Sequence, residues 1–240
     1  MKLQAQQPDR ADAGGRYALP ELLTVEPELT ETSSLAEKAY YLIRDRIISL
    51  RLAPGVTVNE RALMHQLGLG RTPIREALRR LADEKLVDVA PRRGMFVTHI
   101  DIRDLESIAE VRVEIEGHAA RLAARRATAP EREEAGRLLA WLDERHAVAD
   151  QTELMRFDQR IHRHVHRCTH NRYLTATLEE YFVLSLRLWF LVLDRITRLE
   201  QAITEHRDLL AAIRDGDPER AEAVLRDHVT GFEQEIRRVL

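Results

Sequence analysis

The sequence predicts a mainly α-helical protein built from two parts that differ in charge. Apolar residues recur at spacings of three and four over most of the chain after residue 34, which is the pattern of amphipathic helices. An alternation of two, typical of strands, occurs only in short runs before residue 100. Basic residues outnumber acidic ones by 12 to 7 over 34–100, whereas 101–240 has 22 basic and 27 acidic residues. A basic block beside an acidic remainder indicates that one part meets an anion, with nucleic acid a leading candidate.

Composition excludes several classes of protein. The 240 residues are 44% hydrophobic and 32% charged, which is enough apolar material for a buried core and for two modest domains. The longest apolar run, Tyr181 to Leu193, is broken by Arg187 and is shorter than the ~20 residues that span a membrane. No signal-peptide pattern follows Met1, so we expect a cytoplasmic protein without a membrane segment. The single cysteine, Cys168, allows neither an internal disulfide nor a thiolate metal cluster.

Residues 34–100 have the pattern of a compact domain with three helices and a hairpin. Residues 1–33 mix polar residues, glycine and proline without periodicity and are expected to form a flexible leader. Asn59 offers an N-cap to the second helix, and Thr72 followed by Pro73 offers a cap and a first helical residue to the third. The expected elements are a helix over 35–50 capped by Ser33 or Ser34, a short strand over 56–58, helices over 60–67 and 73–84, and a hairpin that joins 87–89 to 95–97.

Helix, strand, helix, turn, helix and basic hairpin is the order of a winged helix-turn-helix domain. In a helix-turn-helix the recognition helix presents its N-terminal turn to the major groove of DNA, and here that turn carries Arg71, Thr72 and Arg75. The two arginines are four residues apart and share a face, and the guanidinium fork suits contact with guanine or phosphate. Arg92 and Arg93 at the hairpin tip are placed to reach the adjacent DNA backbone or minor groove. The alternative is that these arginines form an ordinary solvated helix face.

Three runs of residues in this part carry a resemblance. They are Asn59-Glu60-Arg61, GRTPIREALRRL over 70–81 and PRRGMFV over 91–97. Together they resemble the DNA-binding domain of GntR-type bacterial transcription regulators. The resemblance implies that Gly94 lets the backbone of the wing approach DNA closely, and Gly70 departs from the serine that is common in the family. It also implies four side chains that contact operator DNA, namely Arg61, Arg71, Thr72 and Arg75.

After residue 101 the pattern is helical throughout and predicts an all-α bundle. Breaks occur at proline, glycine and short polar runs, and no strand signal or internal repeat interrupts the series. Six helices are expected, over 102–128, 130–148, 152–169, 172–192, 195–214 and 218–239.

Four polar side chains lie on the predicted apolar faces of these helices. Asp158 and His162 are four residues apart on the inner face of one helix, and His206 and His228 lie among apolar residues of two others. Leaving such groups buried and unpaired costs ~1–3 kcal/mol or more, so they need partners. One carboxylate and three neutral imidazoles suit a divalent ion such as Zn, Ni, Co, Mn or Fe. Taken singly, each histidine is better explained as a hydrogen-bonded core residue.

A second set of histidines offers rival ligands. Three of its members are spaced at four residues, but the arginines at 163 and 167 are interleaved with them. We therefore expect these histidines, other than His162, to lie mostly at the surface. The set is His162, His164, His166 and His170.

A series of polar and small residues runs through the last four helices: Asp158 with His162, Asn171, Glu205-His206, Gly216-Asp217 with Ala221, and His228. The series resembles the all-helical ligand-binding domain of the FadR/FCD branch of GntR regulators. Ile161 stands where that family often has phenylalanine, which alters packing but no ligand atom. Many members bind a metal through one aspartate and three histidines, at the positions matched here by Asp158, His162, His206 and His228.

One further pair lies near the apolar stripe of the first of these six helices. Arg112 and Glu116 are four residues apart, which by itself indicates a salt bridge on or between helices worth up to about 0.5 kcal/mol. In the family that the chain resembles, the same arginine often faces the pocket, where its guanidinium would pair with a ligand carboxylate. Arg112, Glu116 and Asn171 are therefore expected to bind the effector.

The combined expectation is a cytoplasmic, homodimeric, ligand-responsive transcription regulator that acts as a repressor and is not an enzyme. A small organic acid would bind at the metal and at Arg112, change the spacing of the two DNA-binding domains and lower the affinity for a palindromic operator. Two other functions stay open at this stage. The metal itself could be the signal, or the same histidines and aspartate could activate water in a metal-dependent enzyme, although no further nucleophile or base is evident.

Overall fold

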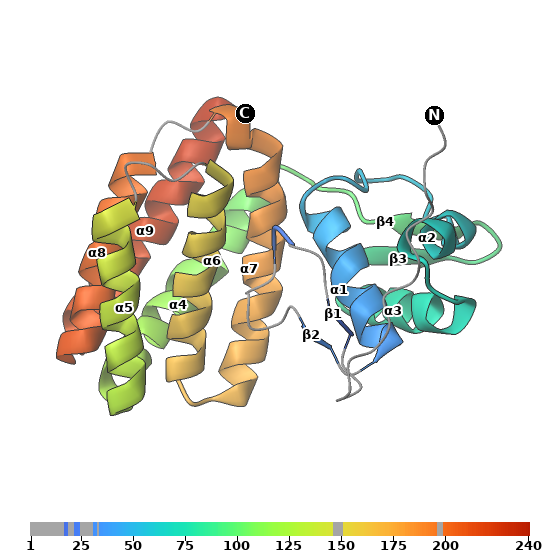
Figure 1. Cartoon of the computed structure of the whole chain (residues 1–240). Helices are drawn as coiled ribbons and strands as arrows, with labels where there is room; N and C mark the ends of the chain where they lie inside the picture. The colour runs from blue at the N-terminus through green and yellow to red at the C-terminus, as the bar shows by residue number, and fades with distance from the viewer. Residues whose placement is uncertain (1–16, 19–21, 25–30, 33, 146–150, 196–198) are drawn as a thin grey trace. The chain divides into compact units, whose positions relative to one another are not determined.

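The chain forms two compact units, residues 1–100 and 101–240. The computed structural model describes residues 17–18, 22–24, 31–32, 34–145, 151–195 and 199–240 of the chain. The predicted fold class is confirmed, because the first unit is a winged helix-turn-helix and the second consists of helices (Figure 1). Most of the predicted leader lies outside the described residues.

The first unit has the predicted order of three helices and a hairpin. Its elements are α1 (Leu35–Ile48), α2 (Glu60–Leu67), α3 (Arg71–Asp83) and the antiparallel strands β3 (Val87–Ala90) and β4 (Gly94–Val97). Ser34 and Asn59 cap α1 and α2, each through a side-chain oxygen that accepts a backbone N–H. The strand predicted over 56–58 is present as a single bridging residue, Thr57, which forms an antiparallel β-bridge with Phe96 of β4.

The third helix begins two residues earlier than the sequence predicts. Its N-cap is Gly70, which has no side chain to accept a hydrogen bond, so the expectation that Thr72 is the cap is wrong. Pro73 becomes the third helical residue, where a missing N–H still costs no intrahelical hydrogen bond. Arg71 and Thr72 therefore belong to the first turn of α3, whose N–H groups and dipole favour an anion.

Part of the chain before residue 34 contacts the first helix of the first unit. β1 (Tyr17–Ala18) pairs antiparallel with β2 (Glu31–Thr32). Thr24 is buried, and both its backbone N–H and its hydroxyl donate to Oδ1 of Asp45 on α1. Leu23 and Thr24 differ from the expectation of a flexible leader, because Asp45 gives them a buried hydrogen-bond partner that no periodicity in the sequence reveals.

The second unit is a bundle with six α-helices among the described residues, as the sequence predicts. The helices are α4 (Asp104–Arg126), α5 (Ala129–Arg145), α6 (Gln151–Cys168), α7 (Arg172–Val192), α8 (Leu199–Asp215) and α9 (Pro218–Val239), with a 3-10 turn, η2 (Leu193–Arg195), after α7. α4 is central, because it contacts α6, α7, α8 and α9, while α5 packs against α8 (Figure 1). The break predicted at 149–151 lies mostly outside the described residues.

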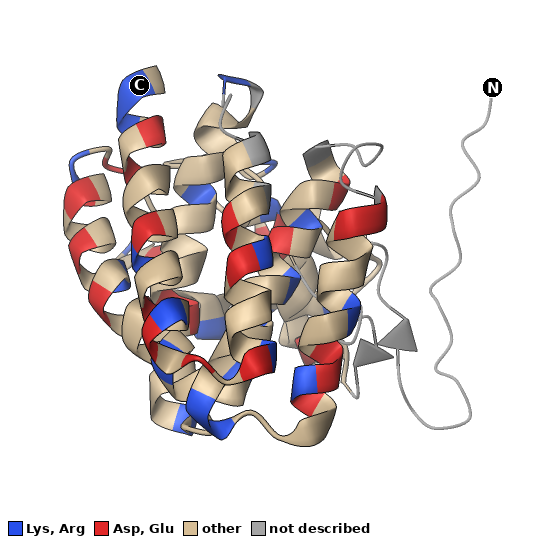
Figure 2. Ribbon diagram, turned by 90° about the vertical axis from the view of Figure 1, so that its left-hand side faces the viewer, with Lys and Arg blue, Asp and Glu red and all other residues tan. Residues whose placement is uncertain are grey.

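Small side chains let the bundle close around its central helix. Ala119, Ala120, Ala123 and Ala124 of α4 are fully buried, so neighbouring helices can approach α4 closely. Charged residues of both signs are distributed along the helices that face the viewer in Figure 2. Among the helices that the structure describes, none combines the length and the apolar character needed to cross a membrane.

Candidate functional site

An open hollow on the first unit is bordered by α2, the start of α3 and the wing. Four arginines that the sequence singles out line it: Arg61 from α2, Arg71 and Arg75 from α3, and Arg92 from the wing. All four are exposed. Positive charge gathered in one hollow attracts a polyanion and orients it. The structure thus brings these four predicted DNA contacts onto one surface, which is named here the arginine hollow.

The tip of the wing depends on left-handed backbone conformations. The φ angle is +63° at Arg92 and +98° at Gly94, which also lines the arginine hollow. A Cβ on Gly94 would meet no atom within 4 Å, so the backbone angle and not crowding favours glycine. Thr72 and Arg93 are exposed but lie outside the lining of the hollow. The wing therefore places one predicted arginine in the hollow and the other beside it.

A single carboxylate lies among these arginines within the lining of the hollow. Glu60 Oε2 accepts a hydrogen bond of 2.9 Å from Nε of Arg75. The two side chains are 29% and 58% exposed, so water and salt screen this ion pair. Arg75 can therefore exchange Glu60 for a phosphate or a base at little cost.

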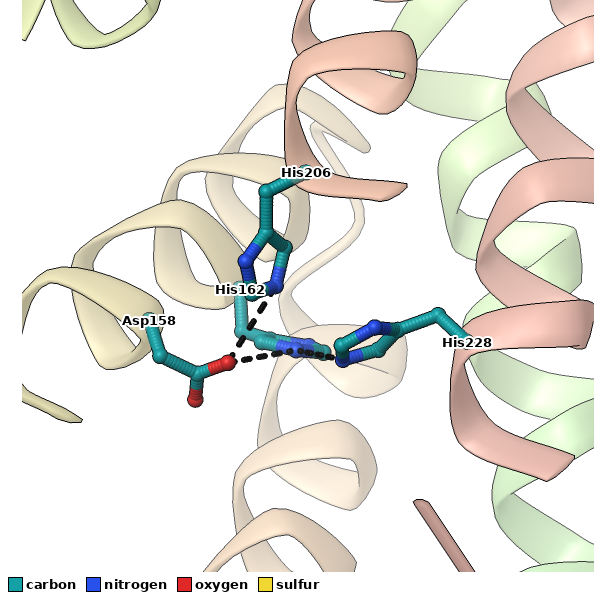
Figure 3. A group of neighbouring side chains, drawn as sticks. All are labelled: Asp158, His162, His206 and His228. Atoms are coloured by element: carbon teal, nitrogen blue, oxygen red, sulfur yellow. Dashed lines mark hydrogen bonds and ion pairs between the residues drawn. The ribbon is translucent and has the colours of Figure 1, made fainter. Parts of the chain in front are cut away.

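Four buried side chains from three helices converge in the second unit (Figure 3). Asp158 and His162 come from α6, His206 from α8 and His228 from α9. Asp158 Oδ1 lies 3.2 Å from His206 Nε2 and 3.7 Å from His162 Nε2. The Nε2 atoms of His162 and His228 are 3.4 Å apart. One donor atom of each residue lies within 4.8 Å of the donor atoms of the other three. Two ligand atoms of one metal ion are up to about 4 Å apart, so these four atoms are close to the spacing of a metal site. The four residues are named here the His/Asp cluster.

Two histidines of the His/Asp cluster are oriented by carboxylates behind them. His162 Nδ1 lies 2.8 Å from Glu116 Oε2, and His228 Nδ1 lies 2.9 Å from Glu205 Oε2. A carboxylate that accepts the Nδ1 proton fixes the tautomer and leaves the Nε2 lone pair facing the cluster, as metal-binding histidines require. Sequence reasoning gave Glu205 no such role, because the contact depends on α8 lying beside α9.

Burial and neighbouring charge set the protonation states of the cluster. Burial raises the pKa of Asp158, but the surrounding His162, His206 and His228 lower it below its usual value. Burial, and then the charge of His206, lower the pKa of His228 to about 4. At neutral pH the carboxylate is ionised and this imidazole is neutral, which are the states that bind a cation. Asp158 Oδ2 is buried without a hydrogen-bond partner among the described residues, so one acceptor stays unsatisfied.

Arg112 and Glu116 of α4 form a buried ion pair. Arg112 donates from Nε to Glu116 Oε1 and from Nη1 to Oγ of Ser185 on α7. Burial raises the pKa of Glu116, but Arg112, followed by His162, lowers it well below its usual range. Glu116 therefore connects the guanidinium to the His/Asp cluster. Sequence reasoning did not identify Ser185, whose place depends on the packing of α7 against α4.

The other histidines of α6 differ from the sequence expectation. His164 and His166 are 2% and 1% exposed, so the expectation that they lie at the surface is wrong, whereas His170 is exposed. The neighbouring Arg163 is buried too, because Glu179 of α7 accepts two hydrogen bonds from its guanidinium. The charge of Arg163 was therefore a poor indicator that the histidines next to it lie at the surface.

The structure does not bring Asn171 to the His/Asp cluster. This residue is exposed and is the N-cap of α7, where its Oδ1 accepts from the N–H groups of Tyr173 and Leu174. Its described contacts are those of a helix cap.

Comparison with known families covers both units. Residues 35–97 match the family described as bacterial regulatory proteins, gntR family, and residues 107–231 match the FCD domain. The transcriptional repressor RspR of Escherichia coli K12 is 23% identical over 220 residues, which are 90% of this chain and 95% of that protein. A probable D-xylose utilization operon transcriptional repressor of Paenarthrobacter nicotinovorans is 29% identical over 204 residues, or 85% of this chain and 89% of that protein.

Solved structures show the same fold. McbR/YncC of E. coli superposes with a TM-score of 0.76 at 23% identity, over 86% of this chain and 99% of that one. A GntR transcriptional regulator of Rhodococcus sp. RHA1 superposes with a TM-score of 0.65 at 22% identity, over 85% of this chain and 98% of that one. Since the FCD match alone covers more than half of the chain and the gntR match covers the helices and wing of the first unit, the protein belongs to the GntR family of bacterial DNA-binding transcription regulators, with an FCD domain as its second unit.

Proposed function

We propose that this regulator is a repressor that binds a divalent metal ion and a small organic acid in its FCD domain and releases operator DNA in response to the acid. The observation that carries the proposal is the His/Asp cluster: one carboxylate and three imidazoles, drawn from three helices, meet in the interior. Burying polar groups costs stability unless they find partners, and a metal ion would satisfy all four together.

The donor set suits Zn, Ni, Co, Mn or Fe, which imidazole and carboxylate ligands all bind. Asp158 would supply one oxygen, and His162, His206 and His228 would each supply Nε2. Glu116 and Glu205 hold two of the rings in the required orientation. A metal held in this way would supply open coordination positions for a carboxylate or hydroxyl oxygen of the acid.

Arg112 is the candidate partner for the carboxylate of the acid. Glu116 and Ser185 occupy Nε and Nη1, while no hydrogen bond among the described residues uses Nη2. The rings of Phe182 and Phe232 have their centroids 5.7 and 5.9 Å from Cζ and form apolar surroundings for the guanidinium. The arginine is therefore anchored at one edge and able to pair with an anion at the other.

The arginine hollow would bind operator DNA, together with Thr72 at the start of α3 and Arg93 and Gly94 in the wing. We take the regulator to act as a homodimer on a palindromic operator, because a twofold dimer reads two half-sites at a fixed spacing. Acid that favours one arrangement of the two DNA-binding domains would change that spacing and weaken binding. Repression is the role named for RspR.

Metal content tests the proposal. Elemental analysis of the protein reloaded with Zn²⁺ should show near-stoichiometric metal, and His206→Ala or His228→Ala should lower it while operator binding persists. His170→Ala is the matched control, because this histidine is exposed and outside the cluster. Full metal stoichiometry in both cluster variants would contradict the ligand set. A change in operator affinity caused by Zn²⁺ alone, with no effect of any acid, would instead identify a metal sensor.

A further inference from the structure

The apolar face of the wing continues beyond the core of the first unit. Alternate residues of a strand point to the same face of a sheet, so Val87 and Val89 of β3 share a face. Val87 pairs with Val97 across the hairpin, and both are buried. Val89 pairs with Met95 one step closer to the tip and is 59% exposed. The hairpin therefore carries one more apolar pair than the core covers.

This extra pair lies in the arginine hollow. Val89 and Met95 both line the hollow, and Met64 of α2 adds a third apolar side chain to its lining. Both methionines are only partly buried. Apolar side chains that stay uncovered and are surrounded by charged ones indicate a contact surface. Met64, Val89 and Met95 are named here the apolar patch.

The shape of DNA determines which part of an operator meets the apolar patch. A recognition helix enters the major groove with its N-terminal turn, and the wing is placed to reach the adjacent minor groove. A single sugar-phosphate strand separates two such grooves. Because the start of α3 and the wing border the hollow, that strand would cross it. The exposed arginines suit its phosphates, which leaves its sugars to the apolar patch.

The sugar of DNA suits an apolar surface better than the sugar of RNA. Deoxyribose has a methylene group at C2′, which packs against valine and methionine without losing a hydrogen bond. Ribose has a hydroxyl at the same carbon. Valine offers this hydroxyl no partner, and the thioether sulfur of methionine is only a weak acceptor. A hydroxyl that loses water without gaining a hydrogen bond weakens binding.

We infer that the apolar patch contacts the deoxyribose of the operator strand between the two grooves and makes the regulator reject a ribonucleotide there. The inference rests on the proposed function for the placing of operator DNA at the arginine hollow. Phosphates are the same in DNA and RNA, so the contacts of arginines with them do not distinguish the two. The 2′-hydroxyl is the group that does.

Single ribonucleotide substitutions test the inference. The probe is a DNA duplex selected from a random pool by repeated binding to the full-length protein. Each deoxynucleotide is replaced in turn by the ribonucleotide with the same base, and the affinity is measured by fluorescence anisotropy. It should fall at least about fivefold at roughly one or two sugars of each half-site, because a buried hydroxyl without a partner is costly, and change little elsewhere.

The 2′-fluoro nucleotide is the control for the shape of the sugar. Fluorine at C2′ favours the same sugar pucker as a hydroxyl but cannot donate a hydrogen bond. At the sensitive sugars the 2′-fluoro duplex should therefore bind nearly as tightly as the unmodified one.

The variant that links the penalty to the apolar patch is Val89→Thr, which keeps the shape of the side chain and offers a hydroxyl to the ribose. The ribonucleotide penalty should shrink at the sensitive sugars. Val56→Thr is the matched control, because Val56 is also exposed in the first unit but lies outside the lining of the hollow. This control should keep the full penalty. Met95→Gln offers an amide from the opposite strand and carries the same expectation as Val89→Thr.

Three results would overturn the inference: no sugar at which a ribonucleotide weakens binding fivefold, an equal penalty for the 2′-fluoro nucleotide, or a penalty that both patch variants leave unchanged. A loss of affinity on replacing thymine by uracil that disappears in Val89→Thr would also overturn it, because the patch would then contact a base methyl group.

Failure of the proposed placing of DNA gives a different result. If DNA binds elsewhere, Arg71→Ala and Arg75→Ala leave the affinity for the unmodified duplex unchanged, and the inference fails with the proposal. If these variants weaken binding and no sugar is sensitive, the inference fails alone.

Discussion

The two functional regions use charged side chains in opposite ways. In the arginine hollow the side chains are exposed, and Arg75, at 58% exposure, holds only a screened ion pair with Glu60. In the His/Asp cluster each residue is less than one-tenth exposed and faces the others. An exposed arginine can exchange a carboxylate for a phosphate at little cost, whereas a buried carboxylate or imidazole must have a partner in place. The first region is an exposed surface suited to a polyanion, and the second is a buried set of donor atoms suited to a cation.

Because one region is exposed and the other is buried, substitutions in the two regions are expected to have different effects. Under the proposed function, a substitution at the exposed surface would remove a contact with DNA and leave the fold intact. A substitution in the buried site would remove a metal ligand together with the hydrogen bonds that orient it. The following predictions, ordered from the largest effect to the smallest, use that contrast.

Acid should destabilise the buried region. The pKa of His166 is about 4 in the folded protein against 6.5 for the free side chain, so the unfolded chain binds a proton that the folded chain cannot. Stability should therefore fall as the pH drops from about 6.5 to about 4, by about 3 kcal/mol from this residue. Urea unfolding of chelated protein, followed by the fluorescence of Trp141 and Trp189, reports on the second unit alone. In His166→Leu the free energy of unfolding should depend less steeply on pH. Equal slopes in the variant and the wild type would show that His166 does not cause the loss of stability in acid.

Arg71→Ala or Arg75→Ala should weaken binding to an operator fragment by about 1–3 kcal/mol per lost base contact. Helical content and metal content should stay the same, because both side chains are exposed. Arg137→Ala, on the outer face of α5, is the control and should not change operator affinity. If neither recognition-helix variant changes the affinity measured by fluorescence anisotropy, α3 is not the recognition helix.

Glu205→Gln should weaken metal binding by about 10- to 100-fold, because it removes the charge that orients and polarises His228. Competition with a metal-sensitive dye measures this affinity. Glu222→Gln, at a carboxylate that pairs with arginines on the surface of α4 and α9, is the control and should leave it unchanged. Equal metal affinity in the two variants would mean that Glu205 has no role at the site.

Asn171→Ala separates a helix cap from an effector contact. The loss of its two hydrogen bonds at the start of α7 should cost about 1 kcal/mol of stability. Calorimetric affinity for the acids should be unchanged, because the side chain is exposed and outside the His/Asp cluster. If the variant loses affinity for the acids without losing stability, Asn171 is an effector contact and not only a helix cap.

Helix periodicity and capping residues made most of the fold predictable. Asn59 caps α2 as expected, and the wing strands pair where an alternation of two occurs. The start of α3 was wrong by two residues, because Gly70 can cap a helix without offering a side-chain acceptor, while Thr72 and Pro73 imitate a cap and a first helical residue. Local signals locate an element well but fix its end only where a side chain makes the capping bond.

The buried site was less predictable, because its partners come from distant parts of the chain. The helical phase of Asp158 and His162 pointed inward, and the structure places His206 and His228 beside them. The burial of His166 was missed because Arg163 implied a surface, and Arg163 is buried through Glu179, 16 residues further on. Contacts of this kind are set by helix packing, and a single sequence carries no local sign of them.

The central claim is that the buried site controls the exposed surface. The direct test compares the operator affinity of Zn²⁺-loaded wild-type protein with and without the small organic acid that binds it tightest, and repeats the comparison after chelation and in His228→Ala. The acid should lower the affinity of the metal-loaded protein only, while the three preparations bind operator equally well without it. An acid effect of the same size after chelation and in His228→Ala would contradict control through the His/Asp cluster.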